Sequence, residues 1–571
     1  MAEKIISPGV FTRENDFSFV SQGVAEIGGA LVGPTVKGPV EVPTMITSYS
    51  EFENIFGGSF ESGSTSHEFI TNLAAEEYLK HSDTLTVVRV SNGAYTAATA
   101  SVSASVNSLP SFKINTVGEG VVMNSGVHGH ADTEGAGHIL ADGTSNNVRW
   151  ETSSQNLSKG TFTLTIRRGD DSKAKKQILE QFINVGLDPN QSNYIGKMVG
   201  TQYASYDSSG KYVKYLGSYP NRSNYVYIDE ASILDTNNWY DADGGVRLAT
   251  ASGSIPADGS GSFAAATGAH PAGALMNENI SAASAQGLAV ADYTVAFELL
   301  SNTDEYDINM VMAPGINDTD HAGATAKMMA MAENRGDCIA LVDPVPFGST
   351  PATAAAVSEA ENNSYAAMYW PWVQINSART GKNVWVPATT CIGGVLAFND
   401  SVSAEWFAPA GLNRGGISSA IRAERKLARA DRDVMYEARL NPLATFPGEG
   451  VVVWGQKTLQ KRTTALDRVN VRRLLINLKK FIASTSKYLV FENNTDATRQ
   501  RFLAAVNPYM ESVQQNQGLF AFKVIMDDTN NTADVIDRNI MKGDIYIQPA
   551  KAAEFIVVDF NIMPTGATFG E

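Results

Sequence analysis

Cysteine is almost absent from this sequence. Only Cys338 and Cys391 occur, too few for a disulfide framework, so we expect a protein that folds in a reducing cytosol. Long hydrophobic runs are also absent, and no stretch of about 18 consecutive apolar residues predicts a membrane span. The first residues, MAEKIISPGVFTREND, lack the apolar segment of a signal peptide. We therefore expect neither secretion nor membrane insertion.

The fingerprints of common enzymes are missing as well. The sequence contains no G-x-x-x-x-G-K-[ST] phosphate loop, no G-x-G-x-x-G, no G-x-S-x-G and no H-E-x-x-H. The stretch ARTGKN at 378–383 ends like a phosphate loop, but it lacks the earlier glycine and has no Ser or Thr after Lys382. We expect no nucleotide site.

One histidine cluster resembles a metal site. His128, His130 and His138 enclose Asp132 and Glu134, and an H-x-H pair can bind zinc because alternate residues of a strand share a face. The run is rich in glycine, which favours a solvated loop. We therefore expect no metal and no cofactor.

Two aspartates offer a possible catalytic site. Asp337 and Asp343 flank a short apolar run that reads as a buried strand, where α/β enzymes often place acids. No histidine or nucleophile accompanies them, and a helix cap explains Asp343 equally well. An enzyme remains the alternative, and the prediction is a protein without catalysis. The DADGG stretch at 241–245 lacks the spacing of a calcium loop and reads as a turn.

Charge is unevenly distributed. The net charge of −16 argues against binding nucleic acid. Residues 413–487 carry 16 Lys and Arg against 6 Asp and Glu, a balance of +10, so the remainder carries −26. A basic module on an acidic body predicts an acidic partner surface or self-association, with an ordinary solvated face as the alternative.

Composition and periodicity predict several domains of mixed α/β and α+β type. Residues 306–344 read as strand, helix, strand, which predicts a βαβ unit and a parallel sheet. From 91 to 290 the chain is rich in Gly, Ala, Ser and Thr, which indicates a β-rich inserted outer region that projects from the surface. The predicted domains are an N-terminal arm at 1–20, a middle α/β domain at 21–90 plus 291–425, the outer region at 91–290, and an inner C-terminal domain at 426–571.

The C-terminal part shows two features of interest. In the predicted helix from Asp467 the cations lie opposite the apolar face, yet Val469 and Ile476 fall among them, which favours a basic docking surface over scattered surface residues. Before it, 418–440 reads as a polar helix or helix pair, and after it 487–493 (KYLVFEN) and 520–527 read as strands. The end of the chain alternates apolar and polar residues, which predicts a strand over Ala553–Asn561 in need of a partner.

Several stretches resemble the contractile phage tail sheath family. They are ISPGVFTREND (6–16), FINVGLDPNQSNYIG (182–196), WFAPAGLNRGGI (406–417), LNPLATFPGEGVVVWGQKTL (440–459), VNVRRLL (469–475), FENNTDATRQRF (491–502), MDDTNNTADVIDRN (526–539) and IYIQPAKAAEFIVVDF (545–560). The resemblance implies a structural protein without cofactor. Such proteins stack as rings around a tail tube and contract, driving the tube through a bacterial envelope.

The resemblance also implies partners and site residues. The partners would be further copies of the chain, an acidic tail tube protein, and baseplate and tail terminator proteins, in a virion tail assembled in the host cytoplasm. The C-terminal α/β domain would be completed by extended arms shared between subunits. The expected arm residues are Ile5, Ile6, Val10, Phe11, Phe555, Val557, Val558 and Phe560. The expected tube-facing residues are Arg472, Arg473, Ile476, Lys479 and Lys480, with Arg499 and Arg501 as the next candidates. The alternative is the sheath of a phage-tail-like bacteriocin or a related injection device.

Overall fold

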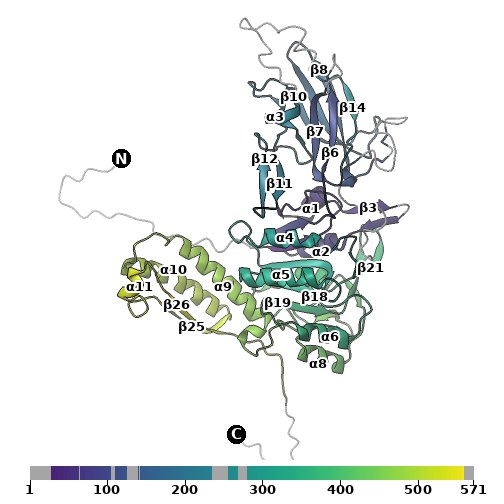
Figure 1. The fold of residues 1–571 in the computed structure, drawn as a ribbon. Coiled ribbons are helices and arrows are strands. Elements are labelled where there is room, and N and C mark those ends of the chain that lie inside the picture. Colours follow the sequence, from purple (N-terminus) through teal and green to yellow (C-terminus); the bar gives the residue numbers. More distant parts are fainter. Residues whose placement is uncertain are drawn as a thin grey trace, which may run out of the picture. The chain divides into compact units, whose positions relative to one another are not determined.

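The computed structural model describes residues 28–62, 65–104, 110–124, 139–140, 142–233, 255–267 and 280–558 (Figure 1). These residues divide into two compact units, one holding 28–479 with 549–558 and the other holding 480–548. Among the helices in these ranges, none is long and apolar enough to cross a membrane.

An eight-stranded sheet forms the centre of the larger unit. Its order is β2-β5-β1-β17-β18-β19-β23-β24, with parallel pairing from β5 to β23 and antiparallel strands at both ends. The central strands read as continuous apolar runs because helices cover both faces of the sheet. The strand bounds are β1 Gly29–Gly33, β2 Thr44–Ile46, β5 Leu85–Arg89, β17 Met310–Asn317, β18 Ile339–Asp343, β19 Ala366–Trp370, β23 Asn441–Phe446 and β24 Gly450–Val453.

Two hydrophobic clusters lie on the two faces of this sheet. Along β1, Leu31 belongs to one cluster and Ala30 to the other, as the alternation of strand side chains requires. The first face is covered by α1 (Tyr49–Phe56), α2 (Ile70–Leu79) and α7 (Thr389–Val402). The second is covered by α4 (Asp292–Leu300), α5 (Ala322–Arg335), α6 (Pro351–Ala360) and α8 (Arg429–Glu437).

The predicted βαβ unit is confirmed. β17 pairs in parallel with β18, Met310 opposite Ile339, and α5 connects them. α5 ends at Gly336, whose φ of 68° is the left-handed conformation that glycine adopts most easily. The sheet continues past the expected domain boundary at residue 426, because β23 pairs with β19 and β24 pairs with β23.

Smaller antiparallel sheets complete this part of the unit. They are β3 (Ser59–Ser62) with β4 (Thr65–Glu68), and β21 (Lys382–Val386), β20 (Val373–Ser377) and β22 (Ala420–Ala423). The helix predicted from residue 418 is wrong at its start. Residues Ala420–Ala423 instead pair with β20, so only α8 is helical in this stretch.

The region between residues 91 and 290 is β-rich, as the sequence predicts, and has a hydrophobic core of its own. Phe112 and Phe162 stack at 5.7 Å between ring centroids and join its two main sheets. One sheet contains β6 (Ala97–Ser103), β7 (Pro110–Glu119) and β13 (Val226–Ile228). The other contains β8 (Val148–Asn156), β9 (Thr161–Arg168), β10 (Ile178–Gly186) and β14 (Gly259–Gly261). The remaining elements are α3 (Ile195–Met198), β11 (Tyr203–Asp207), β12 (Tyr212–Leu216), β15 (Ile280–Ser281) and β16 (Ser284–Ala285).

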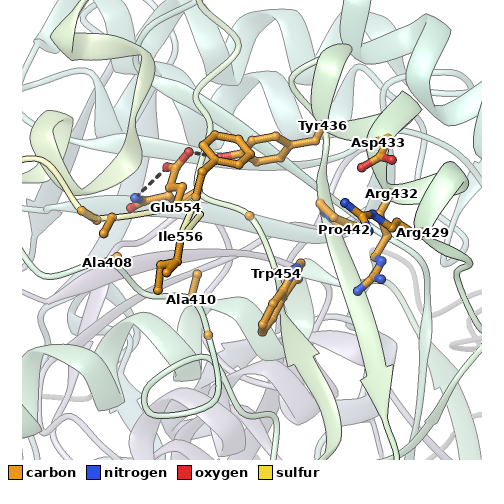
Figure 2. A pocket seen from close by; sticks show the side chains of 16 residues that line it. Ala408, Ala410, Arg429, Arg432, Asp433, Tyr436, Pro442, Trp454, Glu554 and Ile556 are labelled. Carbon is orange, nitrogen blue, oxygen red and sulfur yellow. Dashed lines mark hydrogen bonds between the residues drawn. The ribbon is translucent and has the colours of Figure 1, made fainter. Parts of the chain in front are cut away.

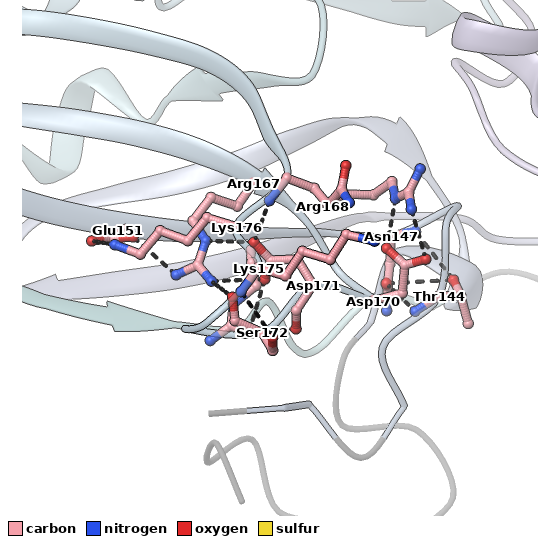
Figure 3. Close-up of polar contacts among 12 residues, drawn as sticks. Thr144, Asn147, Glu151, Arg167, Arg168, Asp170, Asp171, Ser172, Lys175 and Lys176 are labelled. Atoms are coloured by element: carbon pink, nitrogen blue, oxygen red, sulfur yellow. Dashed lines mark hydrogen bonds and ion pairs between the residues drawn. The ribbon is translucent and has the colours of Figure 1, made fainter. Parts of the chain in front are cut away.

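An ion-pair network closes the end of β9 (Figure 3). Arg167 is buried and donates from Nε to Asp171 Oδ2 at 2.7 Å and from Nη1 to Glu151 Oε2 at 2.9 Å. Lys176 Nζ approaches Glu151 Oε1 at 2.6 Å. A buried charge is tolerated only when it is paired and hydrogen-bonded, and this network meets both conditions.

The smaller unit contains the end of α9 (Val469–Lys487), α10 (Asp496–Gln515), α11 (Ala533–Asp537) and the two-stranded sheet of β25 (Leu519–Ile525) and β26 (Asp544–Pro549). Its interior is formed by Phe502, Val506 and Met510 on one face of α10, together with Leu519 and Met526. The strand predicted over 487–493 is wrong. α9 extends to Lys487, and in the turn that follows Tyr488, Val490 and Phe491 are exposed.

Candidate functional site

The last described residues form an extended segment that is fixed at one point. Glu554 accepts hydrogen bonds from Arg468 (Nε to Oε1 2.7 Å, Nη2 to Oε2 3.0 Å), from Tyr436 Oη at 2.7 Å and from Gln456 Nε2 at 3.1 Å. Burial alone would raise the pKa of Glu554, but the hydrogen bonds from Arg468, Tyr436 and Gln456 lower it overall. The carboxylate is therefore held charged and in one position.

Apolar side chains follow this anchor directly and face solvent. Phe555 is 79% exposed, Ile556 and Val557 are each 83% exposed, and Val558 is 64% exposed. Four consecutive exposed apolar residues are unusual on an isolated soluble protein. Their backbone groups also have no ladder within the described chain, since residues 551–558 form no strand. The segment has the character of one half of an interface.

The strand predicted over Ala553–Asn561 is therefore wrong for residues 553–558 in the single chain. A strand requires a partner for its backbone N–H and C=O groups, and none is present among the described residues. Phe560 lies outside the described residues, as do Ile5, Ile6, Val10 and Phe11 of the predicted N-terminal arm.

A pocket of about 480 Å³ lies beside the anchor (Figure 2). Trp454, Pro442 and Ala410 contribute apolar surface to it, and Phe555 and Ile556 of the terminal segment line it as well. Arg429 and Arg432 of α8 supply positive charge at the same pocket. The terminal segment thus lies along a concave surface that it does not fill.

The edge of the central sheet near this pocket is already closed. Gly411 N donates to Val453 O at 2.9 Å, Val453 N donates to Gly415 O at 2.8 Å, and Ile417 N donates to Val451 O at 3.0 Å. By contrast, β25 and β26 form a sheet of two strands only, with Phe520 and Tyr546 exposed on it. A two-stranded sheet is marginal by itself, and no other described strand pairs with its outer edges.

The predicted tube-facing surface of α9 is wrong for three of its residues. Arg472, Arg473 and Ile476 are buried, and Ile476 joins the core cluster on the α1/α2/α7 face together with Val469. Residues on both sides of this half of the helix are buried, so the apolar residues among the cations mark a second buried face. The 3.6-residue pattern could not distinguish these two possibilities.

The two buried arginines have structural partners. Arg473 forms a two-point ion pair with Asp400, with Nη1 to Oδ1 at 2.8 Å. Burial disfavours its charge, but Asp400 more than offsets this and raises the pKa of Arg473. Arg472 donates from Nε to Ser364 O at 3.0 Å and stacks 4.0 Å above the Tyr365 ring. Both side chains hold α9 against the larger unit.

The remaining cations differ in exposure. Lys479 is exposed and reaches Tyr365 Oη at 2.9 Å, whereas Lys480 is half-buried. In the smaller unit Arg499 is buried against Asp528 at 2.7 Å, and Arg501 is exposed. Lys479 and Arg501 are thus the candidates whose charge reaches solvent most freely.

The possible catalytic aspartates do not form a site. Asp337 and Asp343 lie at opposite ends of β18, and Asp337 pairs with Arg335 at 2.8 Å. Asp343 accepts from Thr389 N at 3.1 Å and from the Thr389 hydroxyl, and burial raises its pKa to about 7. Each carboxylate is occupied by a structural contact.

Neither of the other sequence motifs forms a ligand site that the structure describes. Arg379 of the ARTGKN stretch pairs with Glu53, and Lys382 Nζ donates to Ser66 O at 3.2 Å. His128, His130, His138 and the 241–245 turn lie outside the described residues. Across the part of the chain that is described, no group of three or more His, Cys, Asp or Glu is arranged to hold a metal ion.

Sequence reasoning missed the anchor at Glu554. Its signal is a single acid at the start of an apolar run, AAEFIVV, but its partners Arg468 and Tyr436 lie 86 and 118 residues away. Only the folded chain brings these groups together.

Comparison with known proteins gives a consistent result. Family models described as the phage tail sheath protein central domain and the phage tail sheath C-terminal domain match residues 286–459 and 461–563. The tail sheath protein of Vibrio phage KVP40 is 38% identical over 238 residues, which cover 41% of this chain and 36% of the relative. The tail sheath protein of Enterobacteria phage T4 is 32% identical over 300 residues, which cover 49% of this chain and 46% of the relative. The chain thus matches less than half the length of these relatives.

Solved structures agree at the level of fold. A crystal structure of a sheath tail protein from Listeria innocua superposes with a TM-score of 0.54 at 12% identity, covering 93% of this chain and 94% of that chain. At this identity the likeness shows a shared fold alone.

Proposed function

Because the chain belongs to the contractile phage tail sheath family, matched over residues 286–459 and 461–563, we propose that it is the structural subunit of a contractile tail sheath. The subunits polymerise as stacked rings around a tail tube, and contraction of the sheath drives the tube through the bacterial envelope. The family is a structural one, which points to a role without catalysis. The observation that carries the proposal is the anchored terminal segment with four exposed apolar side chains at 555–558.

The segment after Glu554 is the joint between subunits. In this arrangement it leaves its own subunit and adds as a strand to the β25–β26 sheet of a neighbouring copy. The alternation of Ile556 and Val558 with Val557 suits a strand whose two faces are both covered, and the exposed Phe520 and Tyr546 supply apolar surface at the receiving sheet. The N-terminal arm adds in the same way to a second sheet edge of a neighbouring copy, through Ile5, Ile6, Val10 and Phe11.

Such a joint combines strength with freedom of movement. Four to six backbone hydrogen bonds at about 0.5–1.5 kcal/mol net each give a few kcal/mol per junction. The Glu554 anchor fixes where the segment leaves its own subunit, so rigid bodies can rotate about the residues between anchor and strand. The energy for contraction is held in the lattice, and the extended sheath is a kinetic trap that needs no nucleotide.

The tube contact is electrostatic in this proposal. The basic balance of residues 413–487 suits an acidic tube protein, and exposed cations such as Lys479 provide contacts worth about 0.2–1 kcal/mol each. Contacts of this size can break when the sheath contracts, yet together they hold the sheath on the tube because they repeat at every subunit. Baseplate and tail terminator proteins bound the two ends, in a virion tail assembled in the host cytoplasm.

The sheath of a bacteriocin or a related injection device is the second candidate. The matched curated relatives are tail sheath proteins of phages, which favours the phage tail.

Electron microscopy of the purified full chain tests the proposal. We expect tubes of stacked rings, and we expect a chain ending at Glu554 to remain folded but monomeric. Replacing exposed Met45 with serine is the control, since it removes an exposed apolar side chain elsewhere and should leave tubes intact. Monomers of the full chain under all conditions, or normal tubes from the shortened chain, would contradict it.

A further inference from the structure

Tyrosine is concentrated in one short part of the chain. Seven of the 20 tyrosines fall between residues 203 and 227, on β11, β12, β13 and the turns that connect them. Tyr203 is 40% exposed and Tyr215 is 62% exposed, so this is not a core that happens to be aromatic. Tyrosine is the residue that recognition surfaces use most, because it offers a large rigid face and a polar tip at low entropic cost.

Part of this tyrosine surface encloses a pocket of about 220 Å³. Tyr203, Tyr215 and Tyr227 line it together with the polar side chains of Gln202, Asn221 and Glu119. Tyr203 and Tyr227 stack on each other, with centroids 5.0 Å apart and rings inclined by 17°. The pocket is therefore an aromatic wall with amide and carboxyl groups around it.

The polar groups of the pocket are mainly acceptors. Glu119 accepts the Val40 N–H at 3.1 Å on Oε2, and among the described residues no donor reaches its Oε1. The Asn221 amide is occupied inside the fold, because its Nδ2 donates to Val226 O at 3.3 Å and its Oδ1 is buried. Burial raises the pKa of Glu119 to about 7, so the carboxyl can also donate when protonated. A ligand rich in hydroxyl groups would satisfy these atoms.

The charge and the ring geometry of the pocket exclude several other classes of ligand. No Lys, Arg or His lines the pocket, which disfavours phosphate, sulfate and acidic sugars. A quaternary ammonium group requires aromatic rings that surround it. Tyr203 and Tyr227 instead lie face to face, and 5.0 Å between their centroids leaves no room for a cation between them.

We propose that this pocket binds a neutral saccharide, which stacks the C–H face of one sugar ring on the exposed tyrosine surface and directs its hydroxyls to Gln202 and Glu119. One sugar ring is about the size of the pocket. The inference concerns the region between 91 and 290 and does not depend on the proposed sheath function. If that function holds, a weak site repeated on every subunit would bind an extended polysaccharide far more tightly than a single copy does.

Ligand-observed NMR on the full chain tests the proposal with maltotriose, cellotriose, chitotriose and lactose as probes, and with choline and inorganic phosphate as counter-probes. We expect at least one saccharide to bind with a dissociation constant on the order of 1 mM and neither counter-probe to bind. Tyr203→Ala and Tyr215→Ala should each weaken binding about 2- to 10-fold. The matched control is Tyr212→Ala, because Tyr212 is 43% exposed on the same strand pair but does not line the pocket.

Thermal melts establish that each variant is folded, and Gln202→Ala provides a third variant that leaves the tyrosine stack intact. Adsorption of the full chain to purified envelope polysaccharide identifies the source of the ligand. Adsorption that the free trisaccharide competes away indicates a surface polymer, and binding of the free trisaccharide without adsorption indicates a soluble sugar. Absence of binding to every saccharide, binding of choline or phosphate instead, or equal affinity in the Tyr203, Tyr215 and Tyr212 variants would overturn the proposal.

Discussion

Glu554 and Arg468, 86 residues apart in the sequence, form a two-point ion pair with distances of 2.7 and 3.0 Å. The pair lies immediately before the most exposed apolar stretch near the end of the described chain. A fixed point followed by an unpartnered segment is the arrangement expected of an arm that leaves its own subunit in a defined direction.

Removing the charge of this anchor should impair assembly without unfolding the subunit. In Glu554→Gln one side-chain oxygen remains, but the ion pair with Arg468 is lost. The free segment then samples more conformations and loses more conformational entropy when it docks on a neighbour. We expect a lower fraction of polymer in sedimentation and a melting temperature close to that of the parent. Glu437→Gln is the charge-matched control on α8. Equal polymer yields from the parent and Glu554→Gln would contradict the anchor's role.

Assembly should also fall at low pH. The pKa of Glu554 is lowered in the folded chain, so the anchor is fully formed above the ordinary glutamate pKa of about 4.3 and is lost as pH falls through the lowered value. Hydrogen exchange of residues 552–556, measured through this window, should report release of the segment in the parent. In Glu554→Gln the exchange of the same amides should show no such pH-dependent release. A transition of equal size in both proteins would assign the effect to another group.

Arg473 and Lys479 should behave differently although both lie on α9. Arg473→Ala leaves Asp400 without its partner in a largely buried position and should destabilise the fold by about 3–5 kcal/mol. Lys479→Ala removes an exposed charge and should change stability by less than about 0.5 kcal/mol while weakening binding to an acidic tube protein. Chemical unfolding measures the first effect and co-sedimentation with tubes the second. A stable Arg473→Ala variant would show that the buried pair is not structural.

The outer region should be dispensable for the lattice if it is removed at the right positions. Its core is separate from the two clusters of the central sheet, so replacing residues 95–279 with a short linker should preserve ring stacking. The replacement must stop before Ile280, because Ile280 packs on the central core and the buried Gln286 accepts the Ile70 N–H at 3.0 Å. Electron microscopy of this variant should show tubes. A folded variant that forms none would place a lattice contact in the outer region.

The fold was predictable where a pattern repeats within a few residues. The 306–344 βαβ unit and the strand at 520–527 show their period in local sequence, and both are present. Residues 487–493 were mispredicted because Tyr488, Val490 and Phe491 have strand propensity, whereas in the structure α9 ends at Lys487 and a turn follows it.

The candidate site was predictable only in part. The alternating apolar run after Ala553 predicts a segment in need of a partner, but the position at which it is fixed depends on Glu554 meeting Arg468, a long-range contact without a local signal. The prediction that α9 presents a tube-facing surface was wrong for a related reason. Arg472 and Arg473 look solvated on a helical wheel, and only the tertiary contacts with Ser364 and Asp400 show that they are buried.

The most direct test of the account is a high-resolution electron microscopy map of the polymer in which residues 550–571 can be traced. The account predicts that Glu554 remains bound to Arg468 of its own subunit, while the residues after it run as a strand along β25 or β26 of a neighbouring copy. A map in which this segment folds back onto its own subunit, with the β25–β26 edges of every copy unpaired, would contradict it.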